Sequence, residues 1–229
     1  MLLAGLIRML DLDGAALEAA VAEIGVPQLA GCLSLEPRSV HSIAGWGCRV
    51  ALPHAHEHRT LADILHIIES GSMAPAAAAL AQKTFALLAA AEGRVHGLAP
   101  EDVRFHEVGA LDSILDICLS CILFERLSPS LFVCSPLPLA DGGVFCAHGW
   151  LPVPAPAVFE LLEGMPVCGF PGRGETVTPT AIALLRALGA SFGPWPSMLV
   201  ERRALVYGSR VFENAPNGTL FAYGKAVES

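Results

Sequence analysis

Residues 103–117, VRFHEVGALDSILDI, constrain the fold most, because this apolar run carries an imidazole and three carboxylates. These groups belong to His106, Glu107, Asp112 and Asp116. Burial of a polar group without a partner costs free energy, and burial of a charge costs more. The run therefore either reaches the surface at the start of a helix or lines a site that uses these groups.

The composition indicates a compact globular chain. Of the 229 residues, 53% are hydrophobic and 16% are charged, and this length can bury a core without disulfide or metal staples. The net charge of -8 argues against nucleic-acid binding, which needs a basic surface. No run of about 18 uncharged apolar residues occurs, so we expect no membrane-spanning helix. The opening MLLAGLIRMLDLDG lacks the basic region and cleavage site of a signal peptide, so we expect a cytoplasmic protein.

The seven cysteines are odd in number and irregular in spacing. Without an export signal, this pattern is typical of reduced thiols in a core. Cys118 and Cys121 are three residues apart on an expected helix, but a lone pair without a second pair is weak evidence for a metal site.

Apolar periodicity and capping residues predict several helices. They are expected over residues 2–10, 14–25, 61–69, 75–95 and 111–126, with two more opened by the prolines of PVPAPAVFELLEG and VTPTAIALLRALG. Strands are expected in the segments 33–52, with a turn near Gly45 and Gly47, 103–108, LFVCSPL, GGVFCAHGW and 203–224.

Strands and helices alternate from residue 100 onward, which favours an α/β fold. We expect a layered sheet covered by Ala- and Leu-rich helices, with a mixed α+β arrangement as the alternative. A small helical subregion is expected at about residues 55–100.

Asp112 and Asp116 are four residues apart, so both can lie on one face of a helix. Asp112 falls in the first turn, where the helix dipole favours a carboxylate. The alternative is that Asp112 only caps the helix and that Asp116 is solvated. We expect His106, Asp112 and Glu107 to converge where a strand ends and the next helix begins, since ligand sites of open α/β sheets lie at that edge.

The segment PHAHEHR places His54, His56 and His58 at alternate positions. Alternate residues of an extended segment point to the same side, and three neutral imidazoles suit nickel, zinc or copper. The alternative is a solvated loop without a metal.

Two further groups of residues could form parts of a site. His148 lies in the proline-rich segment AHGWLPVPAPA, which would hold the imidazole in place. Glu175 precedes Thr178 and Thr180 at an expected helix start, where phosphates and carboxylates bind, although Thr178 could be a plain N-cap. No Walker loop, dinucleotide-binding glycine fingerprint or nucleophile elbow occurs.

Several blocks of the sequence resemble the LarC family of nickel-insertion proteins. These blocks are HEHRTLADI, AEGRVHG, VRFHEVGALDSILDI, VCSPLPLADGGVFCAHGWLPVPAPAVFELLEGMPV and GETVTPTAIALL, in the family's order. The resemblance implies nickel insertion into pyridinium-3,5-bisthiocarboxylic acid mononucleotide, with nickel–carbon and nickel–sulfur bonds, as a lyase-class nickel chelatase reaction. It also implies dependence on CTP and on magnesium or manganese.

The residue patterns, read together with the resemblance, suggest roles for the candidate residues. Nickel would be collected by histidines, namely His54, His56, His58 and His106. The catalytic lining would comprise His106, Glu107, Asp112 and His148. The nucleotide would be bound near Glu175, Thr178 and Thr180.

The resemblance covers residues 1–225 as one amino-terminal nickel-insertion domain. Members of the family usually open with a strand and a loop rich in glycine, serine and aspartate, and we expect this chain to lack both. We also expect it to lack the family's carboxyl-terminal half, which is associated with CTP. We therefore expect a separate carboxyl-terminal chain as a partner, and a homo-oligomer stays open. The alternatives are a truncated, catalytically degenerate relative that acts as a metal-binding or structural protein, and a hydrolase or transferase with His106 or His148 as its base.

Overall fold

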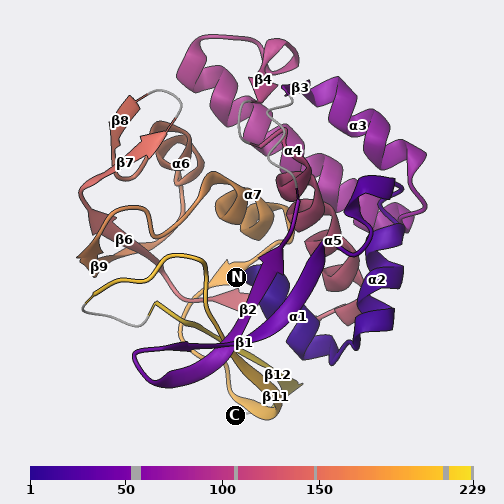
Figure 1. Cartoon of the computed structure of the whole chain (residues 1–229). Coiled ribbons are helices and arrows are strands. Elements are labelled where there is room, and N and C mark those ends of the chain that lie inside the picture. Colours follow the sequence, from indigo (N-terminus) through magenta and orange to yellow (C-terminus); the bar gives the residue numbers. More distant parts are fainter. Residues whose placement is uncertain (53–57, 106–107, 147–148, 214–216, 228–229) are drawn as a thin grey trace.

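The computed structural model describes residues 1–52, 58–105, 108–146, 149–213 and 217–227. Seven α-helices and twelve strands lie within these ranges, which confirms the predicted α/β class (Figure 1). Within the same ranges, no helix is both long and apolar enough to cross a membrane.

Helix α5 (Leu111–Leu127) is the central element of the helical part. Nine of its 17 residues are buried, so it needs partners on almost every side. The helices that pack against it are α1 (Leu2–Leu10), α2 (Gly14–Ala22), α4 (Pro75–His96) and α7 (Pro179–Ala187). Apart from α2, which ends three residues before its predicted end, these helices lie close to the predicted positions.

Local capping explains where two of the helices begin. The carboxylate of Asp13 accepts a hydrogen bond from the Ala16 amide at 2.8 Å and caps α2. Helix α3 (Leu61–Ser70) begins with a capping box, in which the Asp63 amide donates to the Thr60 hydroxyl and the Thr60 amide donates to the Asp63 carboxylate. The Thr60 amide and the Thr60 hydroxyl both donate to the Asp63 carboxylate, and these two hydrogen bonds hold the pKa of Asp63 below its usual value.

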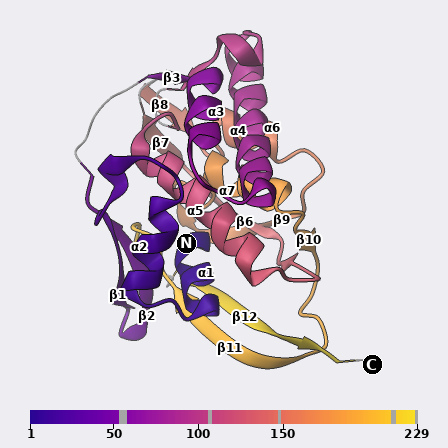
Figure 2. The same cartoon turned by 90° about the vertical axis from the view of Figure 1, so that its right-hand side faces the viewer.

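A four-stranded sheet covers one side of the helical part (Figure 2). Its strand order is β1-β2-β11-β12, with the bounds β1 Leu33–Val40, β2 Ile43–Val50, β11 Met198–Val206 and β12 Thr219–Ala226. The two outer pairs are antiparallel, and β2 and β11 run parallel through the partners Trp46 and Val206. Helix α1 packs against this sheet and also against α5, so it forms the layer between them.

The prediction of a turn near Gly45 and Gly47 is wrong. The turn between β1 and β2 lies at His41 and Ser42, which both have positive φ angles. Gly45 lies inside β2, where an added Cβ atom would come within 2.6 Å of the Leu205 carbonyl oxygen. This glycine therefore allows β11 to approach closely and does not form a turn.

The remaining strands form four short pairs. They are β3 (Arg59–Thr60) with β4 (Arg104–Phe105), β5 (Val133–Cys134) with β10 (Ser191–Phe192), β6 (Leu137–Asp141) with β9 (Val167–Arg173), and β7 (Gly143–Cys146) with β8 (Gly149–Pro152). Short helices complete the described chain, namely the 3-10 helices η1 (Pro27–Leu29) and η2 (Pro100–Asp102), and the α-helix α6 (Pro156–Leu161).

The strand predicted over residues 103–108 is β4, of only two residues, and it runs antiparallel to β3. It does not belong to a parallel sheet. The expectation that a site forms at the edge of an open parallel sheet therefore does not apply to this segment.

Replacement of Leu119 by alanine tests whether α5 is the centre of the core. Leu119 is 0% exposed, so Leu119→Ala leaves a cavity and should lower the free energy of unfolding by about 2–5 kcal/mol. Leu131→Ala is the matched control, because Leu131 is 59% exposed and should change stability by less than about 0.5 kcal/mol. Urea denaturation of both variants measures the difference, and equal losses would contradict the central role of α5.

Candidate functional site

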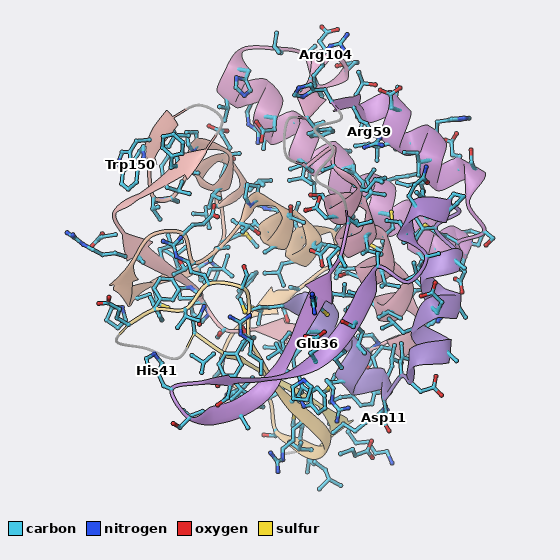
Figure 3. The ribbon with its side chains drawn as sticks, viewed as in Figure 1. Asp11, Glu36, His41, Arg59, Arg104 and Trp150 are labelled. Carbon is cyan, nitrogen blue, oxygen red and sulfur yellow. The ribbon has the colours of Figure 1, made fainter. Side chains whose placement is uncertain are left out.

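A cavity of about 650 Å³ lies where the ends of several elements meet. The start of α5, the start of α7 and the end of α4 line it, together with residues of β2, β4 and the β7–β8 hairpin. In Figure 3 the labelled Arg104 marks the β4 side, and Trp150 marks the hairpin, across the upper part of the molecule. Segments far apart in the sequence therefore share one site.

The first turns of α5 supply one wall of the cavity. Asp112 and Asp116 both line it, which confirms that the two carboxylates share one face of the helix. Asp112 is exposed, and its carboxylate accepts a hydrogen bond from the Ser113 amide at 2.8 Å. Asp116, one turn deeper, is half-buried. The alternative of a freely solvated Asp116 therefore does not hold.

Burial raises the pKa of the Asp116 carboxyl above its ordinary value, and the neighbouring charge of Asp112 adds to this shift. The amino group of Met1 acts in the opposite direction. Together with burial, the charge of Asp116 in turn helps to raise the pKa of two thiols, those of Cys121 on the same helix and Cys48 on β2. The environment of Asp116 is thus mostly apolar or negative, and its charged form is disfavoured.

The start of α7 supplies a second wall. Glu175, Thr178 and Thr180 all line the cavity, as expected if the three residues act together. The Thr178 hydroxyl accepts a hydrogen bond from the Ala181 amide at 3.3 Å, so the predicted N-cap is confirmed. Thr180 and Glu175 are half-buried. This wall combines hydroxyl groups with the positive end of a helix dipole.

Sequence reasoning missed the contribution of α4. Glu92 and His96 line the cavity near the end of this helix and form an ion pair at 3.4 Å when the histidine is protonated. Residues four apart on a helix lie side by side, so this spacing could have predicted the ion pair from the sequence. Arg104 on β4 also lines the cavity and supplies a positive charge.

Cys48 is a further cavity-lining residue that the sequence did not single out. Burial raises the pKa of its thiol to about 11, so the thiol is neutral at physiological pH. A neutral thiol is a poor nucleophile. Cys48 therefore acts as an apolar part of the cavity wall.

Most of the other described cysteines fit the prediction of reduced core thiols, whereas Cys168 is exposed. The six described cysteines are free, and Cys32, Cys118 and Cys121 are buried. Burial raises the pKa of Cys118 and raises that of Cys121 to about 12. Neither thiol is disposed to ionise, so the pair on α5 is part of the core.

Five of the predicted site residues lie outside the described residues, namely His54, His56, His106, Glu107 and His148. His58 is described and exposed. Among the described residues, no group of three or more histidine, cysteine, aspartate or glutamate side chains is arranged to hold a metal ion. The predicted nickel ligands therefore stay a prediction.

The residues on either side of positions 106 and 107 belong to the cavity wall. Phe105 and Val108, which precede and follow residues 106–107, both line it. In the β3–β4 pair Phe105 is the partner of Arg59, so His58 and Phe105 lie at the same end of this ladder. The Arg59 guanidinium donates a hydrogen bond to the Gly109 carbonyl at 2.6 Å, which ties the two segments together.

Comparison with known protein families gives a match along almost the whole chain. The family model described as "Nickel insertion protein" matches residues 1–226. The chain belongs to this nickel insertion protein family.

Two curated relatives illustrate the match. The "Putative nickel insertion protein" of Geotalea daltonii is 40% identical over 209 residues, which are 91% of this chain and 54% of the relative. The "Pyridinium-3,5-bisthiocarboxylic acid mononucleotide nickel insertion protein" of Staphylococcus epidermidis is 36% identical over 185 residues, which are 81% of this chain and 47% of that protein. The chain thus spans about half the length of the relatives it matches. No solved structure matches it.

Replacement of Asp116 by asparagine tests whether this carboxyl is held in an unfavourable environment. Because its pKa is raised on folding, the folded state binds more protons than the unfolded state above the ordinary aspartate pKa of about 3.9. Wild-type stability should therefore fall as pH rises from about 4 through the raised pKa. Asp116→Asn removes this loss, so the variant should gain stability relative to wild type as pH rises toward 7.

Thermal unfolding at a series of pH values measures this difference. Asp102→Asn is the matched control, since Asp102 is exposed and its replacement should change stability by less than about 0.5 kcal/mol. A wild type and an Asp116→Asn variant with parallel pH profiles would show that the Asp116 carboxylate is not desolvated.

Proposed function

We propose that this chain inserts nickel into pyridinium-3,5-bisthiocarboxylic acid mononucleotide. The observation that carries the proposal is the family match over residues 1–226, together with the reaction named in the Staphylococcus epidermidis relative. The cavity supports it, because 650 Å³ lies within the range of about 300–1,000 Å³ that small-molecule sites occupy.

The α7 wall is the proposed binding site for the nucleotide. Helix amino ends bind phosphate through free backbone N–H groups and the dipole, and Thr178 and Thr180 add hydroxyl groups there. Glu175 can accept hydrogen bonds from the ribose hydroxyls. The Arg104 guanidinium, which lines the same cavity, supplies a positive charge for the phosphate.

The histidines are the proposed nickel ligands. Neutral imidazole suits nickel, and the candidates are His54, His56, His58 and His106. Glu107, Asp112 and His148 complete the proposed catalytic lining. The support is positional, because Phe105 and Val108, Asp112, and the β7–β8 hairpin all contribute to one cavity.

Residues 1–225 are the proposed nickel-insertion domain, acting in the cytoplasm. The family resemblance further suggests that the reaction uses CTP with magnesium or manganese. In the proposal these bind to a carboxyl-terminal unit that corresponds to the unmatched half of the relatives.

Nickel titration by calorimetry tests the proposed metal site. The wild-type chain should bind nickel, and the affinity should fall as pH drops through about 6.5, because protonated histidine cannot ligate a metal. A variant with His54, His56 and His58 all changed to alanine should bind at least about tenfold more weakly, since it loses imidazole ligands.

His66→Ala is the control for this titration, because His66 is exposed on α3 and should bind nickel as the wild type does. Full binding by the triple variant would move the site to His106, Glu107 or His148. Absence of nickel binding in the wild type would contradict the proposed function.

A further inference from the structure

The substrate named in the Staphylococcus epidermidis relative imposes a proton transfer on the reaction. Thiocarboxylates at ring positions 3 and 5 flank carbon 4, so a nickel ion held by both sulfurs faces that carbon. Carbon 4 carries a hydrogen, and a nickel–carbon bond can form only when this hydrogen leaves as a proton. The electron pair of the broken C–H bond becomes the nickel–carbon bond, nickel stays divalent, and the proton needs an acceptor.

Four described carboxylates line the cavity, from Glu92, Asp112, Asp116 and Glu175. Glu92 faces His96 at 3.4 Å, and Asp112 is exposed and accepts the Ser113 amide. Glu175 stands on the α7 wall, where the ribose and phosphate are proposed to bind. Asp116 differs from these three, because it makes no hydrogen bond or ion pair with any residue that the structure describes.

We propose that the Asp116 carboxylate accepts the proton that leaves carbon 4 of the pyridinium ring when nickel is inserted. This inference rests on the proposed function. Asp116 lines the cavity one turn of α5 beyond Asp112, so its free oxygens face the space that a bound ring would occupy. The positive ring nitrogen would favour the carboxylate form before the transfer, by attraction between opposite charges.

The surroundings of Asp116 suit a base. Leu3, Cys48 and Leu115 line the same cavity as Asp116, and no described residue donates a hydrogen bond to its carboxylate. Burial raises its pKa, and a general base works best when its pKa approaches the working pH. An ordinary, solvated aspartate would be a weaker proton acceptor.

A single-turnover assay with nickel and the bisthiocarboxylic mononucleotide, at saturating concentrations of both, tests the inference. CTP, magnesium and the unmatched half of the Staphylococcus epidermidis relative are present in every reaction. Product is measured by mass spectrometry, in which insertion adds nickel and removes the displaced hydrogen. Asp116→Asn keeps the shape of the side chain but removes its basicity, and should slow insertion by about 10²–10⁴-fold. Nucleotide affinity and the thermal midpoint are measured in parallel and should not fall. Asp102→Asn, at an exposed position, should react at the wild-type rate.

Formate rescue separates a base from a structural residue. Asp116→Ala removes the carboxylate and leaves space for a formate ion in the cavity. Added formate should therefore restore part of the insertion rate, in proportion to the formate concentration. Formate should not accelerate the wild type or Asp116→Asn, in which the space is filled.

The outcomes distinguish failure of the inference from failure of the proposed function. A wild-type rate in Asp116→Asn would overturn the role of Asp116 alone. A slow Asp116→Ala variant that formate does not rescue, although it is folded and binds the nucleotide, would also overturn it. Absence of product from the wild type would overturn the proposed function and this inference together.

Discussion

Helix α5 is apolar on almost every side, and the rest of the fold follows from the need to cover it. Four helices pack against it, and they leave only its first turns open toward the cavity. This explains why Asp112 and Asp116 stand in those turns, whereas residues 117–123 are all buried and mostly apolar. Burial of a further charge along α5 would cost several kcal/mol.

The same requirement places the cavity at the ends of elements. Helices that are packed along their lengths offer polar groups mainly at their termini, where backbone N–H and C=O groups lack helical partners. The cavity accordingly collects the start of α5, the start of α7 and the end of α4. The sheet contributes to the cavity wall through β2. Helix α1 lies between the sheet and α5 and so sets the distance between β2 and α5. The layered architecture and the site are therefore one arrangement.

Features with local causes were predictable from the sequence. The helices expected from residues 14 and 61 begin there, after the caps Asp13 and Thr60. Thr178 is the N-cap that was one of its two interpretations. Such features are predictable because an N-cap depends on a few adjacent residues. The turn predicted at Gly45 was wrong, because a glycine is needed there for another cause. It leaves room for a strand that lies more than 150 positions away in the sequence. The ion pair of Glu92 and His96 has a local spacing, but its place at the cavity depends on how α4 packs against α5, which the sequence does not state.

Asp116 shows why part of the site could not be read from spacing alone. Its position four residues after Asp112 gives the shared face, but desolvation of its carboxylate results from the packing of α1 and other elements around α5. An apolar side chain at this position would stabilise the fold, since it would remove a half-buried charge. A carboxylate that lowers stability at neutral pH, without a partner among the described residues, is the pattern expected where function opposes stability. The packing that makes the charge of Asp116 unfavourable is also what makes its carboxylate a stronger base.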